Sequence, residues 1–131
     1  MEEALIAVLL ADPGLIETVG SRIDWGRRSG RKPVLPAIVL TRISGTRDLD
    51  LQGASGLVDS IVQADCYGET YASAKGAARA LRDAVNGRSF TERGVVIQRI
   101  SIDSERDTNE RDGQARDLFR TSLDMTIWHD E

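Results

Sequence analysis

The feature that most constrains the fold is a regular alternation of apolar and polar side chains between Leu118 and His129. One side of this segment is mostly apolar and comprises Phe119, Thr121, Leu123, Met125 and Ile127. The other side is polar and comprises Arg120, Ser122, Asp124 and Thr126. A period of two predicts a β-strand with one face on a core and the other in water.

The segment from Leu57 to Tyr67 has the same character. Its apolar side comprises Val58, Val62, Ala64 and Cys66. Its polar side comprises Asp59, Gln63 and Asp65. Two long segments of this kind predict a sheet with one face open to solvent. Further strands are expected at Arg22 to Trp25, at Ala37 to Ser44 and at Gly94 to Asp103, the last with Val96, Ile100 and Ile102 inward.

Two regions have helical spacing. Leu5, Val8 and Leu9 share one face of the first, which Asp12-Pro13-Gly14 interrupts before Gly20 ends it. The region is either one helix with a break or a helix followed by a short second turn. The second region begins at Thr70, a good N-cap, and ends near Asn86. Its expected buried face comprises Tyr71, Ala74, Ala77, Ala78, Leu81 and Val85.

The expected order is therefore α-β-β-β-α-β-β, which belongs to the α+β class. A single, mostly antiparallel sheet would carry helices on one face, and long hairpin loops would join its strands. A chain of 131 residues is a single-domain length, so residues 1–131 are expected to form one domain.

Three polar segments are expected to be loops. Gly45 to Gly56, at about 12 residues, is longer than a normal hairpin turn and falls in the length class of loops that bind something or are disordered. Ser104 to Asp117 is a run of mixed charge and is expected to be a mobile loop. Gly26 to Pro36 contains the only basic cluster, which is either a solvated loop or a contact surface for an acidic partner.

Composition excludes several classes of protein. The net charge of −4 argues against a dedicated nucleic-acid binder, which needs an excess of Lys and Arg. No apolar run approaches the ~20 residues of a membrane span, and the acidic start is a poor signal peptide, so cytoplasmic synthesis is the default. The single cysteine, Cys66, excludes an internal disulfide and is expected to be a small core residue.

Residues for catalysis are scarce. His129 is the only histidine, and its position near the end of the chain predicts poor order instead of a role as general base. The Asp and Glu residues do not fit a calcium loop, and no Cys/His cluster suggests zinc. The phosphate-binding, dinucleotide-binding and nucleophile-elbow motifs are absent. We expect no cofactor, no metal and no enzymatic activity.

The order and spacing of several short motifs resemble a known family. An N-terminal helix leads to a Gly20-x-Arg22-Ile23 turn, and a Pro-led strand ends in RISG at 42–45. A strand ending in VQADCYG at 62–68 runs into a YASAK helix at 71–75. A DSERD segment at 103–107 and a final strand ending in IWH at 127–129 complete the match. Together these features resemble the small tail-completion, or tail-terminator, proteins of long-tailed phages, prophages and gene transfer agents.

This resemblance implies a structural virion protein that forms a hexameric ring at the head-proximal end of the tail tube. The implied partners are further copies of the chain, the tail tube protein and a head-completion or neck protein, with DNA passing through without specific binding. Assembly in the cytoplasm of a bacterial host is implied as well. Another neck component is one alternative, and a small ligand-binding α+β module is another.

Loop length and charge suggest which residues make these contacts. The expected interface residues lie in the three polar loops and comprise Arg27, Arg28, Arg31, Arg47, Asp48, Leu49, Leu51, Glu105, Arg106 and Arg111.

Overall fold

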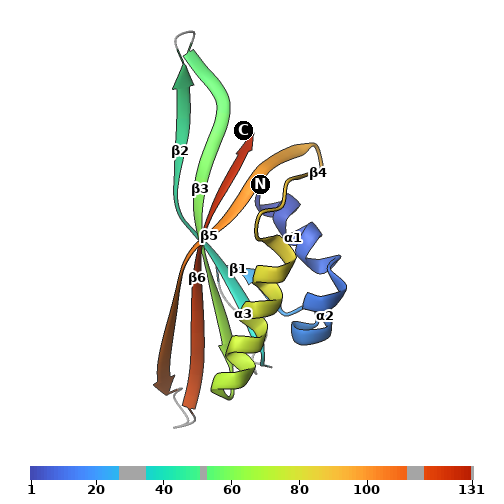
Figure 1. The fold of residues 1–131 in the computed structure, drawn as a ribbon, viewed down its shortest axis with the longest axis vertical. Coiled ribbons are helices and arrows are strands. Elements are labelled where there is room, and N and C mark those ends of the chain that lie inside the picture. Colours follow the sequence, from blue (N-terminus) through green and yellow to red (C-terminus); the bar gives the residue numbers. More distant parts are fainter. Residues whose placement is uncertain (27–34, 51–52, 112–116, 131) are drawn as a thin grey trace.

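The computed structural model describes residues 1–26, 35–50, 53–111 and 117–130, without the side chains of 46–57 and 109–117 at the ends of two hairpins. Three helices and six strands are described (Figure 1). The helices are α1 (Glu2–Leu10), α2 (Pro13–Val19) and α3 (Tyr71–Val85). The strands are β1 (Ile23–Trp25), β2 (Ala37–Asp50), β3 (Gly53–Gly68), β4 (Phe90–Glu92), β5 (Val95–Arg111) and β6 (Asp117–Asp130).

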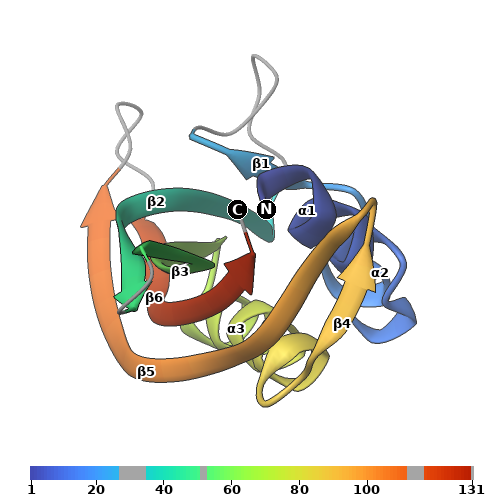
Figure 2. The ribbon, with the colours of Figure 1, turned by 90° about the horizontal axis from the view of Figure 1, so that it is seen from above.

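The strands form one curled sheet in the order β1-β2-β3-β6-β5-β4, and the helices lie on one side of it (Figures 1 and 2). The α+β class is therefore confirmed. The sheet is mixed, because β1 pairs parallel with β2 while every other pairing is antiparallel.

The predicted element order omitted two elements. The broken first helix is two helices, because Asp12 caps α2 by accepting a hydrogen bond from the backbone N–H of Leu15 at 2.9 Å, and Pro13 occupies the first turn. The three-residue strand β4 was not predicted, since so short a segment cannot display a period.

Two of the predicted loops prove to be mainly strand, and these predictions were wrong. Strand β2 continues through Gly45 to Asp50, and β3 resumes at Gly53. Likewise β5 runs to Arg111, and β6 begins at Asp117. These strands extend beyond the helices, so neither face needs apolar residues and the period disappears although the backbone ladder continues. Two long hairpins result, β2–β3 and β5–β6, which extend from the body in opposite directions (Figure 1).

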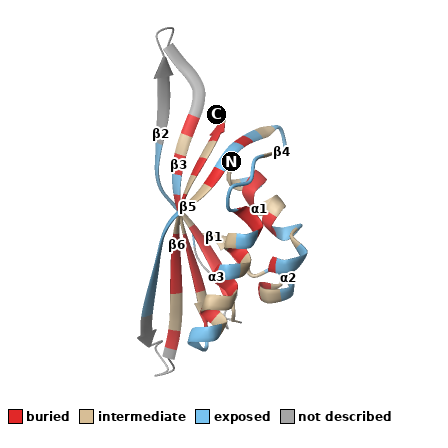
Figure 3. Ribbon diagram, viewed as in Figure 1, coloured by how far each residue is buried: buried red, intermediate tan, exposed pale blue. Residues whose placement is uncertain are grey.

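The core lies between the helices and the sheet, where buried positions gather on facing surfaces (Figure 3). The inward side predicted for β6 is confirmed, with Leu123, Met125 and Ile127 fully buried. Gly68 permits the close approach of α3, because a Cβ there would lie 2.4 Å from the backbone nitrogen of Ala74. Thr70 caps this helix as predicted, its hydroxyl accepting from the N–H of Ser73 at 3.0 Å.

Two predicted core residues are instead exposed. Tyr71 is 53% exposed at the start of α3. Val96 is 37% exposed, whereas its neighbour Ile97 is fully buried. The pairing of β5 with β6 shifts by one residue between Ile97 and Arg99, and such a bulge moves the buried phase from even to odd positions on its N-terminal side.

Candidate functional site

The two residues whose side chains are best suited to catalysis, Cys66 and His129, are both buried. Cys66 is fully buried in the core, and burial raises the pKa of its thiol, so the reactive thiolate is disfavoured as the sequence suggested. His129 was expected to be poorly ordered, and this was wrong. It lies in β6 opposite Val58 and is 5% exposed, because β6 continues to Asp130 as an inner strand of the sheet.

Both ring nitrogens of His129 have partners. Nδ1 lies 2.7 Å from the carbonyl oxygen of Asp130, which can only accept, so Nδ1 carries the proton. Nε2 therefore accepts from the hydroxyl of Ser60 at 2.8 Å. A serine beside a histidine can be a catalytic pair, but this hydroxyl is fully buried and the histidine is oriented by a backbone carbonyl. The pair is a structural link between β3 and β6.

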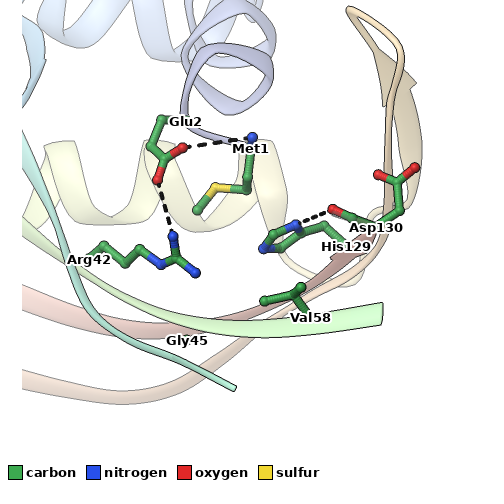
Figure 4. Close-up of a pocket in the computed structure, with 7 residues that line it drawn as sticks. All are labelled: Met1, Glu2, Arg42, Gly45, Val58, His129 and Asp130. Atoms are coloured by element: carbon green, nitrogen blue, oxygen red, sulfur yellow. Dashed lines mark hydrogen bonds and ion pairs between the residues drawn. The ribbon is translucent and has the colours of Figure 1, made fainter. Parts of the chain in front are cut away.

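A cavity of about 400 Å³ opens beside this link (Figure 4). It is lined by Met1, Glu2, Arg42, Gly45, Val58, His129 and Asp130. The guanidinium of Arg42 lies 3.7 Å from the carboxylate of Glu2, and both side chains are nearly half exposed. Gly45 leaves room for this arrangement, since a Cβ there would lie within 2.1 Å of the guanidinium. The lining joins α1 to the base of the β2–β3 hairpin and contains no activated nucleophile.

The β5–β6 hairpin is tied to α3 by a group of charged side chains, which we call the α3 clamp and define as Tyr71, Lys75, Arg82, Glu105 and Asp107. The ammonium of Lys75 lies 3.0 Å from Asp107 and 3.5 Å from Glu105. Arg82 approaches Glu105 at 3.4 Å, and the hydroxyl of Tyr71 donates to Asp107 at 3.1 Å. Hydrogen bonding lowers the pKa of Asp107 and raises the pKa of Lys75.

The opposite face of the sheet carries polar side chains that bond to one another. Arg106 pairs with Asp124, which also accepts from the hydroxyl of Ser104 at 2.7 Å. These bonds lower the pKa of Asp124. Asp65 was expected on the polar face but is buried there, where it accepts from the hydroxyl of Ser122 at 2.6 Å. The polar side chains on this face are therefore held by hydrogen bonds and ion pairs with one another.

Two of the predicted interface residues can be placed fully. Glu105 belongs to the α3 clamp, and Arg106 pairs with Asp124 across the strands. The backbones of Arg47, Asp48 and Leu49 lie in β2 and that of Arg111 in β5, but their side chains are outside the described part. Arg27, Arg28, Arg31 and Leu51 lie outside the described residues.

An exposed apolar pair was missed by sequence reasoning. Ile43 is 56% exposed and Ile61 is 38% exposed, on the two adjacent strands at the base of the β2–β3 hairpin. The available signal was that Ile61 interrupts the polar side of its strand, between Asp59 and Gln63.

In the described part of the chain, no group of three or more His, Cys, Asp or Glu residues is placed to hold a metal ion. None of the described helices has the length and apolarity needed to cross a bilayer.

Comparison with known proteins agrees with this picture. One solved structure with a similar fold is a chain from the virion of a native gene transfer agent particle, and the TM-score is 0.74. The two sequences are 20% identical, and the match covers 100% of this chain and 95% of that one. A second solved chain has a TM-score of 0.58 and 15% identity, covering 97% and 95% of the two chains. At these identities the likeness concerns the fold. No functionally curated protein matches significantly.

The profile of one family matches almost the whole sequence, from residue 3 to residue 130, and that family is described as tail completion protein gp17. The resemblance seen in the sequence motifs is therefore confirmed. The chain belongs to the tail completion protein gp17 family and is a structural protein of a phage-like virion tail.

Proposed function

We propose that the chain is the subunit of a ring that caps the head-proximal end of a phage-like tail tube and joins it to the neck. Family membership over residues 3–130 carries this proposal. The ring consists of identical copies, six by the family resemblance, with the tail tube on one side and a head-completion protein on the other. DNA passes through the ring without specific binding.

The shape of the subunit supports a role in assembly. The β2–β3 and β5–β6 hairpins extend in opposite directions from one small body (Figure 1). A ring closes by heterologous contacts, in which one surface of a copy meets a different surface of the next. Two unlike hairpins give each copy two such surfaces.

The acidic balance fits the passage of DNA. A net charge of −4 gives little counterion release with a polyanion, so DNA is not held as it moves.

The direct test is control of tube length. Purified tail tube protein is allowed to polymerise with increasing amounts of the chain, and tube lengths are measured by negative-stain electron microscopy. We expect tubes to shorten as the chain increases, with extra density at one end only. Unchanged tube lengths with no end density would overturn the proposal. Density at the head vertex without tubes would favour a head-completion protein instead.

The docking role of the β2–β3 hairpin end is tested by the double substitution Leu49→Asp and Leu51→Asp. We expect capping to be lost while the circular dichroism spectrum and melting temperature stay near those of the parent. The control is Leu10→Asp, which makes one substitution of the same kind at an exposed leucine of α1. Full capping by the double variant would reject these two leucines as contacts.

A further inference from the structure

Two long strand edges of the sheet are left open in the described part of the chain. Strand β1 covers β2 only at Ile38 to Leu40, so the stretch of β2 from Arg42 to Asp50 has no described strand beside it on that edge. We call it the β2 edge. Strand β4 covers β5 only at Val95 to Ile97. The stretch from Glu105 to Arg111 is the β5 edge, and Figure 3 shows both outer strands exposed where they leave the body.

The direction of the backbone groups can be followed along β2. The N–H of Ile38 donates to Arg22 at 2.9 Å, and the carbonyl of Leu40 accepts from Gly26 at 2.8 Å, so even positions point away from β3. The pairing shifts by one residue after Arg42, which transfers the outward direction to odd positions. Arg47 then lies opposite Val58, whose own backbone groups turn to β6.

The same alternation holds on β5. Ile100 exchanges backbone hydrogen bonds with Gly87 and Arg88 at 2.8 and 3.2 Å, on the side away from β6. Asn86 accepts from the N–H of Ile102 at 3.3 Å, and the pairing shifts by one residue before Ser104. Beyond that shift the odd positions, including Asn109, direct their backbone groups outward.

We propose that the β2 edge of one copy pairs with the β5 edge of the next, so that one sheet continues through successive copies. This inference rests on the ring proposed above and names the surfaces that close it. Three antiparallel pairings separate β2 from β5, so the two edges run in opposite directions. Copies with the same orientation therefore meet in an antiparallel ladder, and the alternation of strand direction is unbroken around the ring.

A second copy satisfies both edges at once, and this favours it over an unrelated partner. The β2 edge and the β5 edge belong to the two opposite lateral borders of the sheet, and they lie at opposite ends of the molecule (Figure 1). One copy therefore cannot pair its own two edges. Because the two edges lie at opposite ends, each copy must shift along the strand direction relative to the next. A closed sheet whose strands are inclined to its axis requires such a stagger. The α3 clamp holds the start of the β5 edge in place through Glu105 and Asp107, which lowers the conformational entropy lost on pairing.

Proline substitution at outward backbone positions tests the pairing. Arg47→Pro and Asn109→Pro each remove one outward N–H while leaving the internal ladder intact. Arg47→Ala and Asn109→Ala are matched controls that keep it. By sedimentation velocity over a concentration series, we expect the parent and both alanine variants to form closed oligomers. Each proline variant should lose the oligomer, with at least a tenfold rise in the concentration needed for assembly.

Mixing the two proline variants separates loss of an edge from loss of the fold. Each variant retains the edge that the other lacks, so an equimolar mixture should form a heterodimer and nothing larger. A misfolded variant could not do this. Oligomers of normal size from either proline variant, no heterodimer in the mixture, or a parent that stays monomeric at all concentrations would overturn the pairing.

Tube capping is measured on the same variants. Capping by both proline variants would reject edge pairing and leave the proposed function standing. Failure of the parent to cap tubes would reject the proposed function itself. If a single proline variant bound tube protein less well while oligomerising normally, its edge would be a site for a strand of the tube, and the proposed contact between copies would be wrong.

Discussion

The two hairpins of this small protein have similar backbones and different supports. The β5–β6 hairpin is joined to α3 by the α3 clamp, and Arg106 pairs with Asp124 across its strands. Among the described side chains, the β2–β3 hairpin meets α1 through the distant pair of Arg42 and Glu2 at 3.7 Å, and it exposes Ile43 and Ile61 at its base. One hairpin is therefore positioned by charge, and the other depends on the strand ladder and a few buried bonds.

This difference suggests that the two hairpins have different roles in assembly. A hairpin fixed to the body can present a preformed edge, whereas one with exposed apolar side chains gains stability when a partner covers them. We therefore expect acid and the removal of charge to destabilise the β5–β6 hairpin, and the loss of a buried hydrogen bond to destabilise the β2–β3 hairpin.

The largest effect is expected from Ser60→Ala at the base of the β2–β3 hairpin. The substitution leaves Nε2 of the buried His129 without a donor. A change of tautomer cannot compensate, because Nδ1 faces the carbonyl of Asp130. An unsatisfied buried acceptor costs about 1–3 kcal/mol, so the free energy of unfolding in urea should fall by that amount.

Ser44→Ala is the matched control for this substitution, since Ser44 is exposed on the same hairpin. It should change the free energy of unfolding by less than about 0.5 kcal/mol. Equal effects of the two variants would contradict the role assigned to the link between Ser60 and His129.

The next largest difference between the two hairpins is expected in their stability toward acid. Asp107 and Asp124 have a pKa lowered by their partners, so their contribution to stability is present above the unfolded value of about 3.9 and is lost as pH falls through the lowered folded values. Lys75, whose pKa is raised, contributes below about pH 10.4 and does not change in this range.

Amide exchange between pH 5 and pH 2, corrected for intrinsic rates, measures this effect. Protection of residues 104–108 should fall with acid more than protection of residues 42–45. A parallel loss in both segments would mean that acid unfolds the whole protein and that the clamp has no local role.

The sequence predicted the elements whose two faces differ. Strand β6 was readable because Leu123 and Met125 face the core while Asp124 does not, and α3 because Thr70 caps an alanine-rich face. The outer parts of the hairpin strands extend beyond the helices, so no core-facing period marks them and they were predicted as loops. A backbone ladder is independent of side-chain pattern, and only the structure reveals it.

The candidate site was less accessible to sequence reasoning. Glu105 was predicted as an interface residue from the charge of its segment, but its partners Lys75 and Arg82 lie on a helix some 20 to 30 positions earlier in the chain. Sequence spacing does not report such cross-element contacts. The exposure of Ile43 depends in the same way on the pairing shift between Arg42 and Ser44, which no local pattern announces.

The smallest effect is expected from Asp107→Asn, which keeps the shape of the side chain and removes its charge. Lys75 then loses its nearest partner and Tyr71 a charged acceptor, while Thr121 can still donate to the amide oxygen. Because these side chains are partly exposed, the loss in unfolding free energy should be about 0.2–1 kcal/mol.

The position of that loss is more informative than its size. Amide exchange should accelerate in residues 104–108 and stay unchanged in residues 42–45, and 1 M salt should reduce the difference between parent and variant by screening the ion pairs. Asp59→Asn, the same change on the β2–β3 hairpin, should leave β5–β6 unaffected. If Asp59→Asn loosened both hairpins equally, the two would behave as one cooperative unit, and the distinction between a charged support and a ladder support would fail.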